Sequence, residues 1–342
     1  MRKLFLVILT GLVAVGVFAW SSGTLSVSGK GSVSITYDSS DSVFSFSVDK
    51  PTELTISFSD ESTNTGYYVE FGLPCSVKVT TKDIDIGKPA ATATIPILGL
   101  NAAYFYQYLF KSDAASLKLT AGKFSCGVGD HTYSLGKSYS TAFKFNLEGN
   151  VGDTTLGIGP VIYLKDSDIA FDINTAYVSF ANLGLDISAA VLDVTSATPS
   201  IGVTASLDTS AFSDLKLNGY VYAEAEGGTS PDIKKVEVYL DYTYDPYKLS
   251  LDLINKKSAS GFETAMDAKV SYSTELPVIG SVDLSAGLFY SMAKGLENVK
   301  VSAEWTKELI SHKVFVTFYP ENPAANVPKA YAKLGWTGSF SF

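Results

Sequence analysis

The sequence predicts an all-β protein that forms a single transmembrane antiparallel β-barrel of about 16–20 strands. Three observations predict this fold. Apolar and polar residues alternate over segments of about ten residues, charged residues are scarce, and the chain ends on an aromatic residue within such a segment. Charged residues make up only 18% of the chain, whereas soluble domains have roughly 25%. Part of the surface is therefore expected to face something other than water.

The first 19 residues predict a secretory signal peptide. Arg2 and Lys3 provide the basic start, residues 4–18 form an apolar stretch, and a small-x-small site ends at Ala19. An uncleaved anchor helix is the alternative, but the apolar stretch is shorter than the roughly 20 residues that span a bilayer. We expect residues 1–19 to be a cleaved signal and residues 20–342 to form one barrel domain.

The composition argues against several classes of function. Of the 26 basic residues, Arg2 and Lys3 lie in the signal, which leaves 24 lysines, no arginine and a formal charge that changes from −9 to −11. A nucleic-acid partner is therefore not expected, because phosphate binding requires a basic surface. The two histidines, His131 and His312, cannot build a multi-histidine metal site. We expect no enzyme activity, no catalytic residues, no metal and no cofactor.

The segment from 236 to 253 illustrates the alternation. Even positions from 236 to 244 are all apolar or aromatic, and the opposite face carries Glu237, Asp241 and Thr243. Asp245 and Pro246 are typical turn residues, and an alternating segment with Asp252 on its polar face follows. This pattern predicts a β-hairpin with two unlike faces.

Charged side chains recur in the middle of such segments, opposite residues that are nearly all apolar. A strand of this kind can face lipid on one side and water on the other. A soluble sandwich would show the same alternation, but a chain of this length would then need thick connections or several domains. The predicted pore-lining residues are Lys144, Glu148, Lys216, Glu237, Asp241, Asp252, Asp267, Asp283, Lys300 and Glu304.

The last segment carries Leu334, Trp336, Phe340 and Phe342 on one face. Here the sequence resembles bacterial outer-membrane β-barrel proteins, whose amphipathic last strand ends in an aromatic residue that the assembly machinery recognises. Trp336, Phe340 and Phe342 match this assembly signal, whereas Thr337 stands where the family usually has glycine.

The resemblance implies an outer-membrane porin, and a porin of a deep-branching, sheathed bacterium is one subtype that would fit. Its partners would be outer-membrane lipid, the barrel-assembly machinery, two further copies in a homotrimer, and small hydrophilic solutes that diffuse through a water-filled channel. Acids slightly outnumber lysines on the predicted inner face, so at most a weak cation preference is expected. A structural envelope barrel and a secreted β-rich adhesin remain alternatives.

A flexible, polar segment from Ser125 to Gly136, with Asp130 and His131, is the predicted constriction loop inside the barrel. An ordinary surface loop is the alternative. Residues 82–100 are a second candidate, or an irregular strand pair. Cys75 and Cys126 could form a disulfide in an oxidising compartment or remain free thiols on strand faces; the sequence leaves both open.

Removing Phe342, or replacing it with lysine, is expected to impair outer-membrane assembly, because the terminal aromatic residue carries the predicted signal. The measurement is the fraction of protein inserted in the outer membrane after expression. Normal insertion would contradict the role of the terminus.

Overall fold

The computed structural model describes residues 24–40, 43–47, 52–61, 63–73, 76–80, 92–94, 99–165, 168–259, 261–307, 310–327 and 329–341. The predicted signal peptide, Cys75, Phe342 and most of the second candidate loop lie outside these residues. Within the described part, three single-turn 3₁₀ helices accompany the strands. No helix among these residues is long and apolar enough to cross a membrane.

All strands belong to one antiparallel sheet. In chain order they are β1 (Thr24–Asp38), β2 (Val43–Ser47), β3 (Thr52–Asp60), β4 (Thr65–Leu73), β5 (Ser76–Thr80), β6 (Thr92–Thr94), β7 (Gly99–Lys111), β8 (Ala115–Val128), β9 (Leu135–Val151), β10 (Thr154–Lys165), β11 (Asp168–Phe180), β12 (Leu185–Leu192), β13 (Ser200–Asp208), β14 (Lys216–Glu226), β15 (Asp232–Tyr244), β16 (Tyr247–Ser258), β17 (Gly261–Leu276), β18 (Gly280–Ser291), β19 (Gly295–Lys307), β20 (Ile310–Tyr319) and β21 (Tyr331–Ser341). The short helices are η2 (Ala181–Leu183), η3 (Thr209–Ala211) and η4 (Pro323–Ala325).

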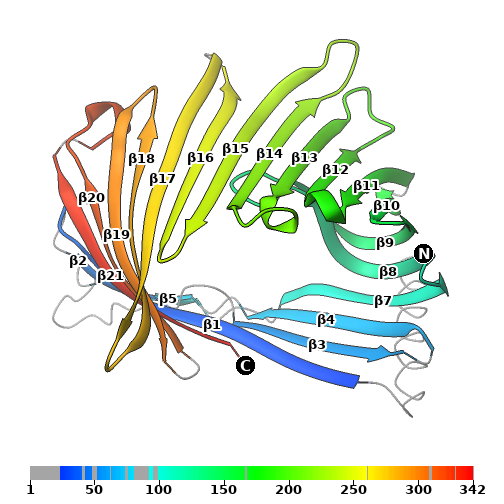
Figure 1. Cartoon of the computed structure of the whole chain (residues 1–342), viewed down its shortest axis with the longest axis horizontal. Coiled ribbons are helices and arrows are strands. Elements are labelled where there is room, and N and C mark those ends of the chain that lie inside the picture. Colours follow the sequence, from blue (N-terminus) through cyan, green and yellow to red (C-terminus); the bar gives the residue numbers. More distant parts are fainter. Residues whose placement is uncertain are drawn as a thin grey trace.

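The sheet closes into a ring, as Figure 1 shows. β1 pairs with β21 on one side and with β3 on the other, β4 pairs with β7, and every later strand pairs with the next one along the chain. Following these pairings from β1 back to β1 passes through 18 strands, all but β2, β5 and β6. The predicted single antiparallel barrel of 16–20 strands, with an even number, is confirmed.

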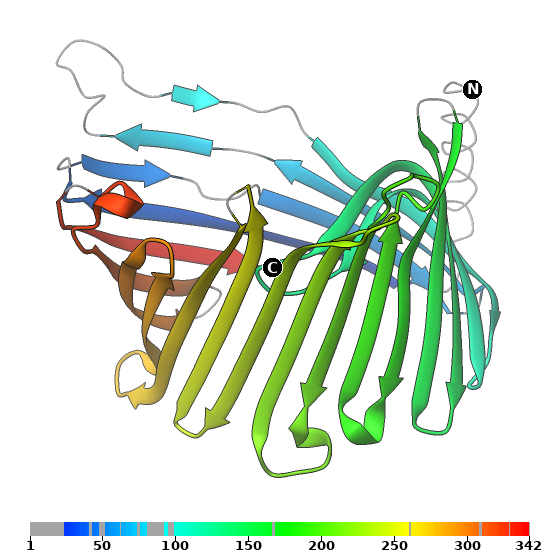
Figure 2. The same ribbon diagram turned by 90° about the horizontal axis from the view of Figure 1, so that it is seen from above.

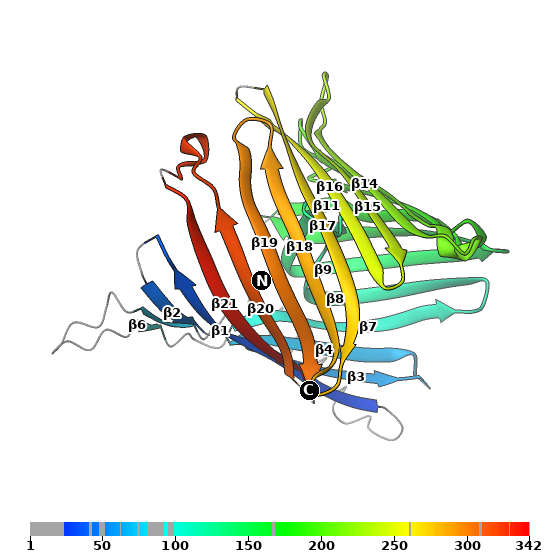
Figure 3. The same ribbon diagram turned by 60° about the vertical axis from the view of Figure 1, so that its left-hand side comes forward.

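β2, β5 and β6 continue the sheet beyond the ring at one end of the barrel. β2 pairs with the second half of β1. The β2–β5 pair continues the register of the β3–β4 pair: Ser47 pairs with Lys78, and Thr52, five residues later, pairs with Leu73, five residues earlier. Figures 2 and 3 show these short strands extending away from the ring. They lengthen the wall on the side of β1.

The two faces of the barrel wall differ in chemistry. The outward face carries apolar side chains that are well exposed, among them Leu249, Val270, Leu288, Val301 and Val316. In the strand register Leu249, Val270, Ala286, Val301 and Val316 form one row across β16 to β20, and Leu288 lies two residues from Ala286 on the same face of β18. Soluble proteins rarely expose an apolar surface of this extent, whereas a lipid-facing barrel requires one.

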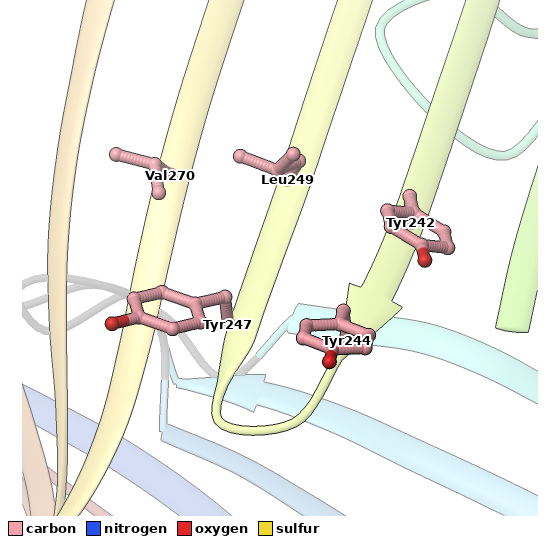
Figure 4. Close-up of a pocket in the computed structure, with 5 residues that line it drawn as sticks. All are labelled: Tyr242, Tyr244, Tyr247, Leu249 and Val270. Atoms are coloured by element: carbon pink, nitrogen blue, oxygen red, sulfur yellow. The ribbon is translucent and has the colours of Figure 1, made fainter.

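Aromatic rings gather on the outer face near the strand ends. At the β15–β16 turn, Tyr242, Tyr244 and Tyr247 line a shallow pocket with Leu249 and Val270 (Figure 4). The rings of Tyr247 and Tyr272 lie 5.2 Å apart on neighbouring strands. Tyrosines in such places fit the boundary between lipid and water, because the ring is apolar and the hydroxyl is polar.

The far end of the β8–β9 hairpin leaves the wall and enters the barrel. β7 pairs with β8 only as far as Lys123, and β10 pairs with β9 only as far as Ala142. Beyond these points β8 lies against β11, β12 and β13, which are not its neighbours in the ring. The bend coincides with a register shift after Gly122, whose φ of 138° is a conformation that favours glycine.

The strands of this hairpin are longer than the sequence suggested. Ser125–Val128 and Leu135–Gly136, predicted as loop, belong to strands: Ser125–Val128 pairs with Leu135–Ser138. The loop is therefore reduced to residues 129–134. The prediction was wrong here because the Gly- and Ser-rich composition suggested a loop, whereas the ladder of backbone hydrogen bonds accommodates these small residues.

Replacing Gly122 with valine is expected to destabilise the barrel by about 1–3 kcal/mol, the usual cost of a strained backbone conformation. A Cβ atom at this position would lie 2.3 Å from the Ala103 carbonyl oxygen. Unfolding in urea, followed by the gel mobility of the folded form, measures the change. Gly149→Ala is the control, because its nearest atom lies 3.9 Å from the new Cβ; equal effects of the two changes would contradict the explanation.

Candidate functional site in the barrel interior

The inward part of the β8–β9 hairpin has two unlike faces. Phe124 and Tyr139 are buried and pack with Val161, Tyr163 and Ala170 of β10 and β11 in one apolar cluster. The opposite face is small, polar and exposed, and consists of Ser125, Gly127, Gly136, Ser138 and Ser140. The hydroxyl oxygens of Ser125 and Ser138 lie 2.7 Å apart across the two strands. The hairpin therefore covers part of the inner wall and presents hydroxyl groups to the remaining space.

A polar network fastens the hairpin to the wall at its base. The Lys137 Nζ atom lies 3.1 Å from carboxylate oxygens of both Asp172 and Asp193. It also donates a hydrogen bond to the Tyr163 hydroxyl, and Lys165 reaches Asp193 at 3.2 Å. Because the Asp172 side chain has no exposed surface, Lys137 supplies the charge that makes its burial tolerable.

Asp172 also accepts two further hydrogen bonds. The Tyr139 hydroxyl donates to it at 2.7 Å, and the backbone N–H of Asp193 donates at 2.5 Å. Asn174 then donates to the Tyr139 hydroxyl at 2.9 Å and to the Cys126 carbonyl oxygen at 3.2 Å. Wall and hairpin thus share one buried hydrogen-bond network.

Asp193 lies in the connection after β12 and adopts a left-handed backbone conformation with a φ of 53°. Burial alone would raise the pKa of its carboxyl group, but hydrogen bonds from Lys137 and Lys165 outweigh that effect and lower the pKa. Because its pKa is lowered, the ionised Asp193 carboxylate stabilises the folded protein at pH values above the ordinary pKa of an aspartate. This stabilisation is lost as the pH falls through the lowered pKa. The base of the hairpin is therefore held at neutral pH.

The tip of the hairpin is held by carboxylates on β15 and β16. The backbone N–H groups of Thr132 and Tyr133 donate to the two carboxylate oxygens of Glu237, at 2.8 and 2.9 Å. The Thr132 hydroxyl donates to Asp252 at 2.8 Å. Glu237 has no exposed surface, so the two N–H groups replace water as its hydrogen-bond donors.

The predicted loop residues Asp130 and His131 lie at this tip. The His131 ring stacks on Tyr239 with 4.1 Å between ring centres and meets the edge of Tyr220 at 4.5 Å. The Asp130 N–H donates to the Tyr220 hydroxyl at 3.0 Å. Both side chains are exposed. Figure 1 shows the β8–β9 connection on the inner side of β13 to β15.

The predicted pore-lining residues fall into three groups. Glu237, Asp241 and Asp252 are buried, the first and the last of them beneath the hairpin tip, and Asp241 pairs with Lys248 at 2.7 Å. Two others, on β9, are half-buried: Lys144 and Glu148. The exposed group comprises Lys216, Asp267, Asp283, Lys300 and Glu304.

The exposed group lies mainly on β17 to β19, and its exposure shows whether the inner face is packed or open there. On these strands Asp267, Asp283 and Lys300 are exposed on one face, while Leu288 and Val301 are exposed on the other. A wall with exposed side chains on both faces has no packed core on either side. The inner face of β17 to β19 therefore borders open space.

The sequence did not single out the residues that fasten the hairpin base: Lys137, Tyr139, Asp172, Asn174 and Asp193. The only available signal was the pair Asp172 and Asn174, two polar side chains at alternate positions within an otherwise apolar segment of β11. Their partners are up to 48 positions away in the chain. Pattern reasoning along one strand cannot find such contacts.

Cys126 is half-buried on the inward hairpin, and its thiol has no disulfide partner among the described residues. Its pairing with Cys75 stays a prediction, because Cys75 is not among the described residues. No cluster of three or more possible metal ligands occurs in the described part of the chain.

Of the predicted assembly signal, Trp336 and Phe340 lie on β21, on the outward face with Leu334. The His312 ring lies between Trp305 and Trp336, at 5.3 and 5.9 Å between ring centres. The last strand thus contributes to an outer aromatic cluster.

No family model matches the sequence, and no curated protein matches it either. Among solved structures, engineered variants of the Rhodopseudomonas blastica porin are similar to this chain. A triple mutant aligns with a TM-score of 0.47 at 13% identity, and a double mutant with 0.46 at 13%; each alignment covers 93% of this chain and 100% of the porin chain. At these values the likeness carries no argument about residues or activity. By its own strand pairing the chain is a single antiparallel β-barrel, as the sequence predicted.

Proposed function

We propose that the protein is an outer-membrane porin through which small hydrophilic solutes and ions diffuse passively. The observation that supports this most directly is the closed ring of 18 strands with an apolar outer face and a polar inner face. Barrels of about 16–18 strands are wide enough to leave an aqueous channel, whereas eight-stranded barrels are filled by side chains. In this proposal residues 1–19 are a signal peptide that directs the chain to secretion.

The inward hairpin is the constriction in this proposal. Its apolar face covers the inner wall from β10 to β13, and its tip reaches β16 through Asp252. Solutes would then pass between its Ser and Gly face and the wall formed by β17 to β21 and β1. Asp130 and His131 would border this passage at the tip.

The selectivity of the channel would be weak and in favour of cations. Seven of the ten predicted pore-lining residues are acidic and three are lysines. At the hairpin tip both carboxylate oxygens of Glu237 accept hydrogen bonds, whereas Asp252 accepts one from Thr132 and its Oδ1 has no partner among the described residues. These hydrogen bonds oppose the charge of the two carboxylates, so their field reaches the passage only in part. The absence of arginine after Arg2 removes the rigid forked donors that would sharpen a transverse field.

A homotrimer belongs to the same proposal. The outward face of β11 to β14 includes some small side chains: Ala176 lies opposite Ala189, whereas Ala205 lies between Ile187 and Val221 and Gly219 lies opposite Leu207. Small residues allow close contact between membrane-embedded surfaces. The mass of the detergent-solubilised protein measured by light scattering tests this assembly.

Purified protein in planar lipid bilayers is expected to give stepwise openings of large conductance. A protein that requires detergent for extraction and yet stays electrically silent would point instead to a structural envelope barrel. Solubility without detergent after removal of the signal would point to a secreted adhesin.

Glu237→Gln is expected to raise the single-channel conductance or its flicker, because an amide cannot accept both N–H groups of the hairpin tip. Asp267→Asn removes one charge from the exposed inner wall without touching the hairpin, and it should change only the ion preference. Identical traces for the two variants would contradict the constriction role.

Leu288→Lys is expected to destabilise the inserted barrel by about 2–4 kcal/mol, the cost of a charge on the lipid face near mid-membrane. Asp267→Lys is the matched control. Asp267 lies on β17 next to Ala268, the residue opposite Leu288, and its side chain points to the opposite face of the wall. Unfolding from lipid vesicles measures both. A similar loss in both variants would argue against a lipid-facing outer surface.

A further inference from the structure

The inner wall from β17 to β20 carries its charges in separate rows. In the strand register, Lys269 lies opposite Gly287, which lies opposite Lys300. Two residues further along each strand comes a row of hydroxyls, Ser271, Ser285 and Ser302. Both lysines are exposed. The wall therefore holds two ammonium groups beside a row of hydroxyls.

The two lysines are not neutralised by their surroundings. Two inward lysines on the neighbouring strands β20 and β21 have acidic partners: Lys313 pairs with Glu304 at 3.1 Å, and Lys333 pairs with Asp38 at 3.0 Å. Neither Lys269 nor Lys300 forms an ion pair with any described residue. The charges of Lys269 and Lys313 act on Lys300 and are opposed by the charge of Asp267. The row has a local excess of positive charge.

Gly287 leaves the space between the two lysines open. Neighbouring strands are roughly 4.8 Å apart, so the backbones of Lys269 and Lys300, two strands apart, are separated by roughly 10 Å. Two flexible lysine stems can converge on one small anion across that distance. A side chain at position 287 would project from the wall into this space, whereas glycine leaves the space empty.

The neighbouring hydroxyls complete a set of donors. Ser285 is half-buried and lies 2.7 Å from the hydroxyl of Ser302, which is buried, so the two are hydrogen-bonded to each other. Ser271 is half-buried and lies next to Ser285 in the register. Hydroxyls and ammonium groups together are suited to the several oxygens of a phosphate or a carboxylate. Chloride, a single atom, would gain less from such an arrangement.

We propose that Lys269 and Lys300, with Gly287 between them and the adjacent serines, form a binding subsite for the oxyanion group of a small solute, a phosphate or a carboxylate. The subsite lies on the part of the wall that the hairpin leaves uncovered, because the tip of the hairpin ends at Asp252 on β16. Its role as a transient binding site for permeating solutes rests on the proposed porin function. The subsite is confined to this part of the inner face, and the acidic groups lie elsewhere on that face.

Inorganic phosphate is the probe, and its binding to the detergent-solubilised protein at low ionic strength is measured by ³¹P NMR line broadening. Saturable broadening is expected for the native protein. The double variant Lys269→Gln/Lys300→Gln should bind phosphate about tenfold or more weakly, since charge-assisted hydrogen bonds are lost. Lys216→Gln, which removes a lysine paired with Asp245 near the β15–β16 turn, is the control and should bind as the native protein does.

A second variant separates a built subsite from simple charge. Gly287→Ala adds a methyl group between the lysines, with its Cβ 3.1 Å from the Ala268 carbonyl oxygen, a contact that a small shift relieves. It should weaken phosphate binding while the reversal potential in a potassium chloride gradient stays unchanged. Equal binding by the native protein and the double glutamine variant would overturn the subsite.

Bilayer recordings with added phosphate tell the two proposals apart. Partial, saturable block of the native channel that is lost in the double glutamine variant supports both. A protein that never opens but loses phosphate binding in that variant keeps the subsite and refutes the porin. A conducting channel whose phosphate binding is the same in both proteins keeps the porin and refutes the subsite.

Discussion

The pairing of β1 with β21 is the constraint on which the structure depends. It joins the first and last strands across Lys30 to Asp38 and Ser341 to Lys333, and so leaves no open edge in the ring of 18 strands. A sheet with an apolar outer face could not enter lipid with unpaired backbone groups at an edge, because each would cost several kcal/mol there. Closure also forces the other face inward, which creates the interior that the hairpin and the charged rows occupy.

The hairpin shows how a wall element becomes a part of the interior. Gly122 permits the bend, apolar residues on one face of the hairpin replace lipid contacts with contacts to β10 and β11, and Asp172 and Glu237 anchor its base and tip. Both anchoring carboxylates are buried and receive charge or hydrogen bonds from the hairpin. A buried carboxylate without such partners is strongly unfavourable, so the docked position is the one in which wall and hairpin satisfy each other.

The interior is divided between two kinds of polar surface. Beneath the hairpin, acids, tyrosines and one asparagine are buried in a dense network. On β17 to β19 lysines and acids are exposed, and a row of half-buried or buried serines lies among them. Both surfaces are made of the inward-pointing side chains, which are every second residue along each strand. The difference arises because the hairpin packs against the wall from β10 to β16.

The sequence by itself determined the strands, their two faces and the barrel. Period-two alternation is a local property, and the faces of Val236 to Tyr244 or of Leu334 to Phe340 can be assigned from it without knowing any neighbour. Only the tertiary structure decided which strands meet. The contacts of Lys137 with Asp172, of Thr132 with Glu237, and the row of Lys269, Gly287 and Lys300 depend on ring closure and on register. Alternation assigns a side chain to a face, but the partner opposite it is chosen by the backbone hydrogen bonds between strands.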